Sequence, residues 1–115
     1  MLRLVIDTDP GVDDAHAIML ALAHPNVQVE AITTVSGNVH VHQTTTNALK
    51  ILDTLGCEVP VFAGSERALI SLNQHAEYVH GKDGLGDSGY PLSKRNISHE
   101  HAVNALIRMG NDSPG

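Results

Sequence analysis

An acidic turn near the amino terminus, residues 5–15 (VIDTDPGVDDA), constrains this chain more than any other stretch. Residues 2–6 are apolar except for Arg3 and predict a short buried strand, and Pro10-Gly11 predicts a turn after it. A helix is expected to begin near Asp13. A strand, a turn and a helix in immediate succession favour an α/β fold.

Four carboxylates lie within this turn: Asp7, Asp9, Asp13 and Asp14. If the strand pleat continues that far, Asp7 and Asp9 point to one face, about 6–7 Å apart. Asp13 and Asp14 are placed to cap the helix, which is an ordinary structural role for one carboxylate. Four acids on one loop repel each other, and a cation or a shared proton would offset that cost. The turn therefore predicts a metal site or an acid-base site.

The remaining sequence alternates between helical and extended patterns. Strand, helix and strand within the first 35 residues form a βαβ unit, which implies parallel strands. We therefore predict one α/β domain over residues 1–115, with a mostly parallel, Rossmann-like sheet flanked by helices. The expected helices cover 15–24, 41–55 (ended by Gly56) and 101–109 (capped by Ser98, ended by Gly110), and the further strands cover 27–35 and 59–63.

Two polar positions lie where ligands bind in such folds. Asn38 follows the second predicted strand, and the carboxyl ends of parallel strands face the ligand side of the sheet. From the residues alone, a turn Asn is the simpler interpretation. His80 opens a glycine-rich stretch, HGKDGLG, and is a candidate proton-exchanging residue, whereas the alternative is an exposed loop. His40 and His42 are expected to be surface residues, because they flank a helix start.

Bulk properties exclude several classes of partner. The net charge is −6 and no basic cluster is present, which argues against nucleic-acid binding. No segment approaches the length of a membrane span, and the acidic turn follows the first residue too closely for a signal peptide. The single cysteine, Cys57, fits a reducing compartment, so we expect a cytoplasmic protein. An uncovered sheet edge would favour association, and we expect a homo-oligomer.

Residues 7–15 (DTDPGVDDA) resemble the amino-terminal signature of the inosine-uridine-preferring nucleoside hydrolase family. Gly37-Asn38 and residues 80–86 match the same family in the right order. Enzymes of this family hydrolyse the N-glycosidic bond of ribonucleosides to ribose and free base, with a calcium-bound water activated by Asp. The resemblance implies this activity, a Ca²⁺ cofactor, a small-molecule ribonucleoside substrate and a place in purine or pyrimidine salvage.

The resemblance also implies roles for individual residues. Asp9 would bind the metal and act as general base, and Asp14 would be the second metal ligand. Asp13 and Asn38 would bind the ribose hydroxyls, and His80 would line the pocket as a catalytic residue. In addition, Asp7 would support the loop or the metal site from behind.

The family's enzymes are much longer than this chain, which looks like their amino-terminal part. Calcium takes about six to eight oxygen ligands, and Asp9 and Asp14 supply at most three. One alternative is therefore a truncated, non-catalytic fragment that binds calcium or a partner. A second alternative is an aspartate-based phosphatase, since Asp7 and Asp9 form the Asp-x-Asp that follows its first strand. That motif usually continues with Thr or Val where this chain has Gly11.

Overall fold

The structure is a computed structural model that describes residues 1–70, 81–86, 91, 93 and 95–114. In this part of the chain, strands and helices alternate as the sequence predicts. The elements in order are β1 (Leu2–Thr8), α1 (Val12–Ala23), β2 (Val27–Thr34), α2 (Val41–Leu55), β3 (Val61–Ala63) and α4 (Ala102–Asp112).

The three strands form one parallel sheet in the order β1-β2-β3. Thr8 at the end of β1 pairs with Thr34 at the end of β2, which in turn pairs with Ala63. The carboxyl ends of all three strands therefore meet at one rim of the sheet. The predicted parallel α/β architecture is confirmed.

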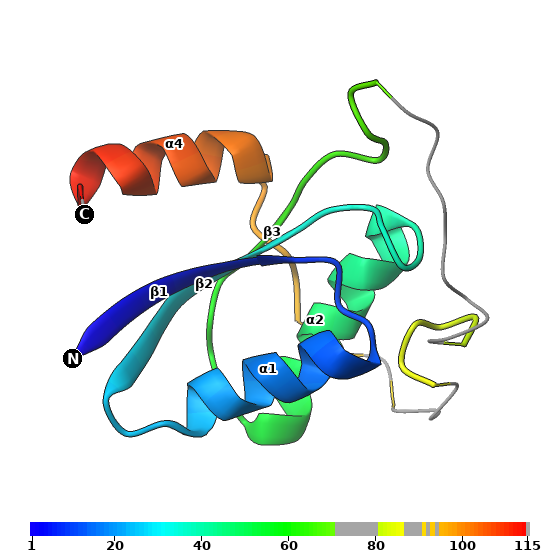
Figure 1. The fold of residues 1–115 in the computed structure, drawn as a ribbon, viewed down its shortest axis with the longest axis horizontal. Helices are drawn as coiled ribbons and strands as arrows, with labels where there is room; N and C mark the ends of the chain where they lie inside the picture. Colours follow the sequence, from blue (N-terminus) through cyan, green and yellow to red (C-terminus); the bar gives the residue numbers. More distant parts are fainter. Residues whose placement is uncertain (71–80, 87–90, 92, 94, 115) are drawn as a thin grey trace.

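Helices cover both faces of this sheet. In Figure 1, α1 and α2 lie below the strands and α4 lies above them. Side chains alternate accordingly along β2, because successive residues of a strand point to opposite faces. Ile32 packs with Ile18 and Leu52 in the core under α1 and α2, whereas Ala31 packs with Ala105 under α4.

Both ends of α2 lie where the sequence predicts them. The helix spans Val41–Leu55 as predicted, and Gly56 ends it in the left-handed conformation, with φ at 65°. Its backbone N–H bonds the carbonyl groups of Asp53 and Leu52, which satisfies the last turn.

Several predicted boundaries are wrong. The helix predicted over 15–24 is α1, Val12–Ala23, and the strand predicted over 59–63 begins only at Val61. Three further errors concern β1 and α4. First, β1 continues two residues beyond Ile6, because Asp7 and Thr8 stay paired to β2. Moreover, β1 is an edge strand in this sheet and Leu2 is 59% exposed, so the strand is not buried.

The other two errors concern α4. Its N-cap is His101, not Ser98, and His101 Nδ1 accepts a hydrogen bond from Val103 N. The helix continues through Gly110 to Asp112, since one glycine in a helix is tolerated at a modest energetic cost.

None of the described helices is long and apolar enough to span a membrane.

Candidate functional site

The acidic loop, residues 9–14, connects β1 to α1 at the rim where the strands end. Gly11 is the N-cap of α1, and its backbone N–H donates to Asp14 Oδ2 at 3.1 Å. The Asp14 carboxylate therefore closes the first turn of the helix, as the sequence suggests for a capping acid. It is half-buried, while Asp13 beside it is exposed.

Asn38 joins Asp9 and Asp14, the two acids that the family resemblance implies as metal ligands. Its backbone N–H donates to Asp9 Oδ2 at 2.8 Å, and its side-chain Nδ2 donates to the Asp9 carbonyl oxygen at 2.9 Å. The same Nδ2 lies 3.3 Å from Asp14 Oδ2. A single residue after β2 thus fixes both the backbone and the carboxylate of Asp9, and it contacts Asp14 as well.

Gly37 is required for this approach. A Cβ atom at this position would lie 2.0 Å from Asp9 Oδ2 and 2.7 Å from Asp9 Cγ. No side chain fits there without displacing the carboxylate. The Gly-Asn pair therefore has a steric reason that is independent of any turn preference.

Buried threonines hold the segment before Asn38 in place. Thr44 Oγ1 donates to the carbonyl oxygen of Val35 at 3.0 Å, which ties the end of β2 to the first turn of α2. Thr34 Oγ1 and Thr45 Oγ1 lie 2.7 Å apart, and Thr45 Oγ1 also donates to the Val41 carbonyl oxygen at 2.6 Å. Because Thr45 has only one hydroxyl proton, Thr34 is the donor between the two. Sequence analysis missed this network.

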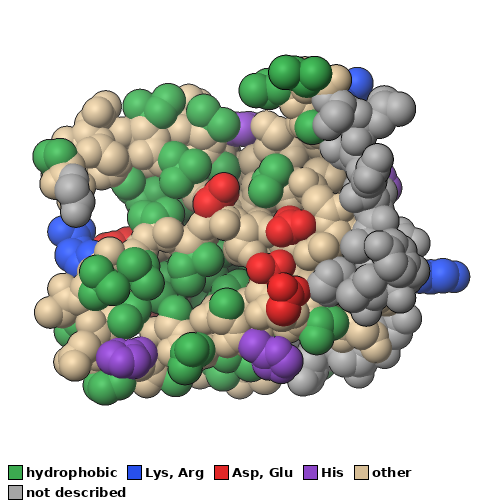
Figure 2. Space-filling view, viewed as in Figure 1, with side chains coloured by type: hydrophobic (Ala, Val, Ile, Leu, Met, Phe, Trp, Pro, Cys, Tyr) green, Lys and Arg blue, Asp and Glu red, His purple; other side chains and the backbone are tan. Residues whose placement is uncertain are grey.

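The electrostatics of the loop are those of crowded carboxylates. Burial raises the pKa of the Asp14 carboxyl above its ordinary value, and the negative charges of Asp9 and Asp13 raise it further. The hydrogen bond from the Gly11 N–H acts in the opposite direction. Figure 2 shows acidic side chains gathered on the face of the molecule near the end of β1. The loop thus favours an added positive charge or a proton.

Asp7 lies apart from this arrangement. It belongs to β1, and its Oδ1 accepts a 2.6 Å hydrogen bond from Thr33 Oγ1 of the neighbouring strand. This bond helps to align β1 with β2 at the rim.

A second loop, residues 81–86, packs beside the acidic loop. Leu85 is buried in the same core cluster as Ala15 and Ile18 of α1. The link between the loops is Asn47 of α2, which is fully buried and whose Nδ2 donates to the carbonyl oxygens of both Pro10 and Asp83. Sequence analysis missed Asn47, although a polar residue next to Ala48 on the buried face of a helix was an available signal.

Two of the three histidines considered in the sequence analysis are among the described residues. His80, predicted as a site residue, lies outside the described residues. His40 and His42 are exposed at the start of α2, as expected.

The donor chemistry of the acidic loop fits a hard cation such as Ca²⁺, which prefers carboxylate oxygens. Asp9 and Asp14 are held together through Asn38, and burial and then the negative charge of Asp9 raise the pKa of the Asp14 carboxyl. They provide only part of a coordination shell. Among the described residues, no group of three or more His, Cys, Asp or Glu side chains is arranged to hold a metal.

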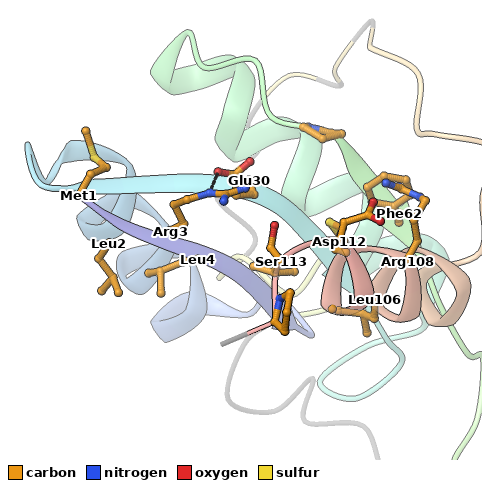
Figure 3. Close-up of a pocket in the computed structure, with 15 residues that line it drawn as sticks. Met1, Leu2, Arg3, Leu4, Glu30, Phe62, Leu106, Arg108, Asp112 and Ser113 are labelled. Carbon is orange, nitrogen blue, oxygen red and sulfur yellow. Dashed lines mark hydrogen bonds and ion pairs between the residues drawn. The ribbon is translucent and has the colours of Figure 1, made fainter.

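A groove elsewhere on the molecule does not belong to this site. It lies between α4 and the first residues of β1, where Arg3 pairs with Glu30 at 2.7 Å (Figure 3). Arg3 lies near the start of β1 and Glu30 in the middle of β2, whereas ligands of parallel sheets bind beyond the carboxyl ends of the strands.

Known proteins are similar to this chain in sequence and in fold. The sequence model of the family described as inosine-uridine preferring nucleoside hydrolase matches residues 4–115. A probable uridine nucleosidase 2 of Arabidopsis thaliana is 38% identical over 116 residues, covering 98% of this chain and 36% of that protein. An inosine-uridine preferring nucleoside hydrolase of Crithidia fasciculata is 39% identical over 109 residues, covering 93% of this chain and 35% of that protein.

Solved structures agree with these relatives. A plant nucleoside hydrolase matches with a TM-score of 0.92 and 40% identity, over 98% of this chain and 36% of that one. A purine-preferring ribonucleoside hydrolase from Gardnerella vaginalis matches with a TM-score of 0.89 and 37% identity, over 95% of this chain and 36% of that one. The chain spans just over a third of the length of these proteins. It belongs to the inosine-uridine preferring nucleoside hydrolase family.

Proposed function

We propose that this chain carries the acidic half of a ribonucleoside hydrolase site, which cleaves the N-glycosidic bond to give ribose and free base. The observation that supports this proposal best is the set of contacts by which Asn38 joins Asp9 and Asp14. Relatives described as uridine nucleosidase and as inosine-uridine preferring nucleoside hydrolase support the substrate class. Purine or pyrimidine salvage is the corresponding physiological role.

In this proposal, Asp9 accepts a proton from the attacking water. The water oxygen bonds to the anomeric carbon as the carbon–nitrogen bond breaks, and the bonding electrons leave with the base. One water proton remains on the new ribose hydroxyl, and Asp9 takes up the other. The departing base gains one proton at its nitrogen from solvent, and Asp9 returns its proton to solvent, so that one water is consumed overall. The hydrogen bond from Asn38 N to Asp9 Oδ2 keeps the carboxylate oriented for this transfer.

The other residues position the ribose. Exposed Asp13 at the start of α1 and the Asn38 side chain are the proposed ribose-hydroxyl contacts. Nearby carboxylates also stabilise the positive charge that develops on the sugar as the base leaves. His80 keeps its proposed place beside the nucleoside, and Asp7 supports the loop indirectly through its bond to Thr33.

Asp9 and Asp14 are the residues that would hold Ca²⁺. When bound, the cation would supply positive charge that eases deprotonation of water and binds ribose hydroxyls.

A second candidate function is calcium binding without turnover. The contacts by which Asn38 holds Asp9 and Asp14 together favour it, because two neighbouring carboxylates can bind a cation without a complete catalytic site. A homo-oligomer, formed through the open edges of the sheet, would be one way to complete the site. The single cysteine supports a cytoplasmic location.

Ribose release from inosine and from uridine distinguishes these functions. We would measure it with the 115-residue chain in Ca²⁺ and in a chelator, alongside Ca²⁺ affinity by calorimetry. Chelator-sensitive release supports hydrolysis, whereas Ca²⁺ binding without release supports the second candidate. If the chain neither releases ribose nor binds Ca²⁺, both candidate functions are overturned. Ribose release that the chelator leaves unchanged overturns the role of the metal.

A further inference from the structure

We infer that Asn47 is a positioning residue, which holds the acidic loop and the 81–86 loop against each other at the rim of the sheet. The part of this inference that concerns metal binding rests on the proposed function above. Its structural part, the coupling of two loops by one side chain, does not.

The contacts of Asn47 use both of its N–H donors and one of the two lone pairs of its amide oxygen. Its Nδ2 donates to the Pro10 carbonyl oxygen at 3.2 Å and to the Asp83 carbonyl oxygen at 2.6 Å. Its Oδ1 accepts from Gln43 Nε2 at 2.9 Å, one turn earlier in α2. The side chain is fully buried, so water cannot replace these partners.

The chemistry at this position selects an amide. Backbone carbonyl oxygens only accept hydrogen bonds, so both loops need a donor from residue 47. An Asp of the same shape would place a carboxylate oxygen against two carbonyl oxygens in a buried setting. A Leu of similar size would remove the Nδ2 donor from both carbonyl groups.

The fit of the second loop is equally tight. A Cβ atom on Gly84 would lie 2.9 Å from Asn47 Nδ2 and 3.2 Å from Val39 Cγ2. Gly84 also has a φ of 77°, which other residues rarely adopt. The backbone of this loop therefore packs directly on the Asn47 amide.

Asn47 contacts the acidic loop at a backbone carbonyl group that lies between the two proposed metal ligands. Pro10 directly follows Asp9, and Gly11, which follows Pro10, donates to Asp14. Fixing the Pro10 carbonyl thus fixes the turn between the two proposed metal ligands. Residues that support ligands from behind typically change metal affinity or activity by about 10- to 100-fold when mutated.

The first test is structural and uses the metal-free 115-residue chain. We would measure amide hydrogen exchange of Gly11 and Leu85 by NMR in Asn47→Asp and Asn47→Leu. Ile51→Val is the matched control, because Ile51 is buried in the same helix within the core beneath the loops. We expect faster exchange at both amides in the Asn47 variants than in the control at equal thermal stability.

Gly84→Ala provides a second perturbation that keeps Asn47 in place. It should speed exchange at Gly11 as well as at Leu85, because displacement of one loop is transmitted through Asn47. If the Asn47 variants do not fold, the exchange rates of Gly84→Ala alone decide whether Asn47 couples the two loops. Unchanged exchange at Gly11 in Gly84→Ala, or equal exchange in the Asn47 variants and the control, would overturn the inference.

The second test measures Ca²⁺ affinity of the same variants. About tenfold weaker binding for Asn47→Asp, with Ile51→Val close to the parent chain, is the expected result. Equal affinity in the two variants would overturn the functional part. If the parent chain does not bind Ca²⁺, the proposed metal role fails, and the exchange data still decide whether Asn47 couples the loops.

Discussion

The backbone N–H of Asn38 donates a 2.8 Å hydrogen bond to Asp9 Oδ2, joining residues 29 positions apart in the sequence. The contact exists because β1 and β2 end side by side, with Thr8 paired to Thr34. It places an uncharged donor against a carboxylate that other acids crowd. The geometry of the proposed base therefore depends on the loop after β2 as much as on its own loop.

Gly37→Ala tests this dependence. The added Cβ would overlap Asp9 Oδ2, so the carboxylate or the loop must move. We expect weaker Ca²⁺ binding by calorimetry and, where release is measurable, slower ribose release. Gly110→Ala is the control, since nothing lies within 4 Å of its new Cβ in α4, and it should raise thermal stability slightly. Parent-like Ca²⁺ affinity in Gly37→Ala would contradict the assigned contact.

Asp9→Asn tests the proposed base. The amide oxygen still accepts from Asn38 N, so the fold should be retained and circular dichroism should be unchanged. The amide cannot take up the water proton, and ribose release should fall by about 10²- to 10⁴-fold. Asp112→Asn, at the end of α4, is a charge-matched control. Turnover close to that of the control would remove Asp9 from the mechanism.

Asp14→Asn tests the charge balance of the loop. Because the pKa of Asp14 is raised in the folded chain, the folded state holds its proton more tightly than the unfolded state. This group's contribution to stability is therefore present at low pH and lost as the pH rises through its folded pKa. In a chelator at neutral pH, Asp14→Asn should melt at a higher temperature than the parent chain, and the difference should shrink in acid.

Added Ca²⁺ should reverse that order. Ligands that bind only the folded state raise its melting temperature, and the parent chain retains the charged ligand that the variant lacks. Thermal melts with and without Ca²⁺ measure both effects. A variant that is less stable than the parent in the chelator at neutral pH would contradict the repulsion argument.

Substitution of Thr45 should destabilise the fold more than substitution of Thr34, although the two hydroxyls form one hydrogen bond. In Thr45→Val, the Thr34 hydroxyl loses its acceptor in a buried site, and we expect a loss of about 1–3 kcal/mol in the free energy of unfolding. Thr34→Val should cost less, since Thr45 still donates to the Val41 carbonyl oxygen. The double variant should cost less than the sum of the two. Urea unfolding measures all three, and strictly additive losses would show that the hydroxyls do not interact.

Sequence patterns predicted the fold well because periodicity and turn residues are local. Val41–Leu55 shows an apolar stripe and a terminal Gly, and both of its bounds are confirmed. The end of β1 was placed too early because its last two residues are polar and are kept in the strand by pairing with β2. His101 caps α4 through a ring nitrogen, a role for which Ser98 had the more familiar signal.

The sequence predicted which polar residues share one rim of the sheet, but not the contacts between them. The acidic turn contains Asp9 and Asp14, which the family resemblance assigned to a metal, and the parallel sheet placed Asn38 on their side. The individual hydrogen bonds of Asn38, the steric need for Gly37 and the role of Asn47 all depend on contacts between distant segments. No local pattern encodes those contacts, since each requires the tertiary fold to bring the partners together.

The position of the acidic loop and Asn38 within one βαβ unit has a consequence for folding kinetics. Asp9, Asp14 and Asn38 all lie in the first 38 residues, and pairing of β1 with β2 aligns them. Only one intervening helix separates these strands, so their contact closes a short stretch of chain and is among the early non-local events available to it. On the ribosome, where the amino terminus emerges first, these three residues can meet before the later helices are synthesised.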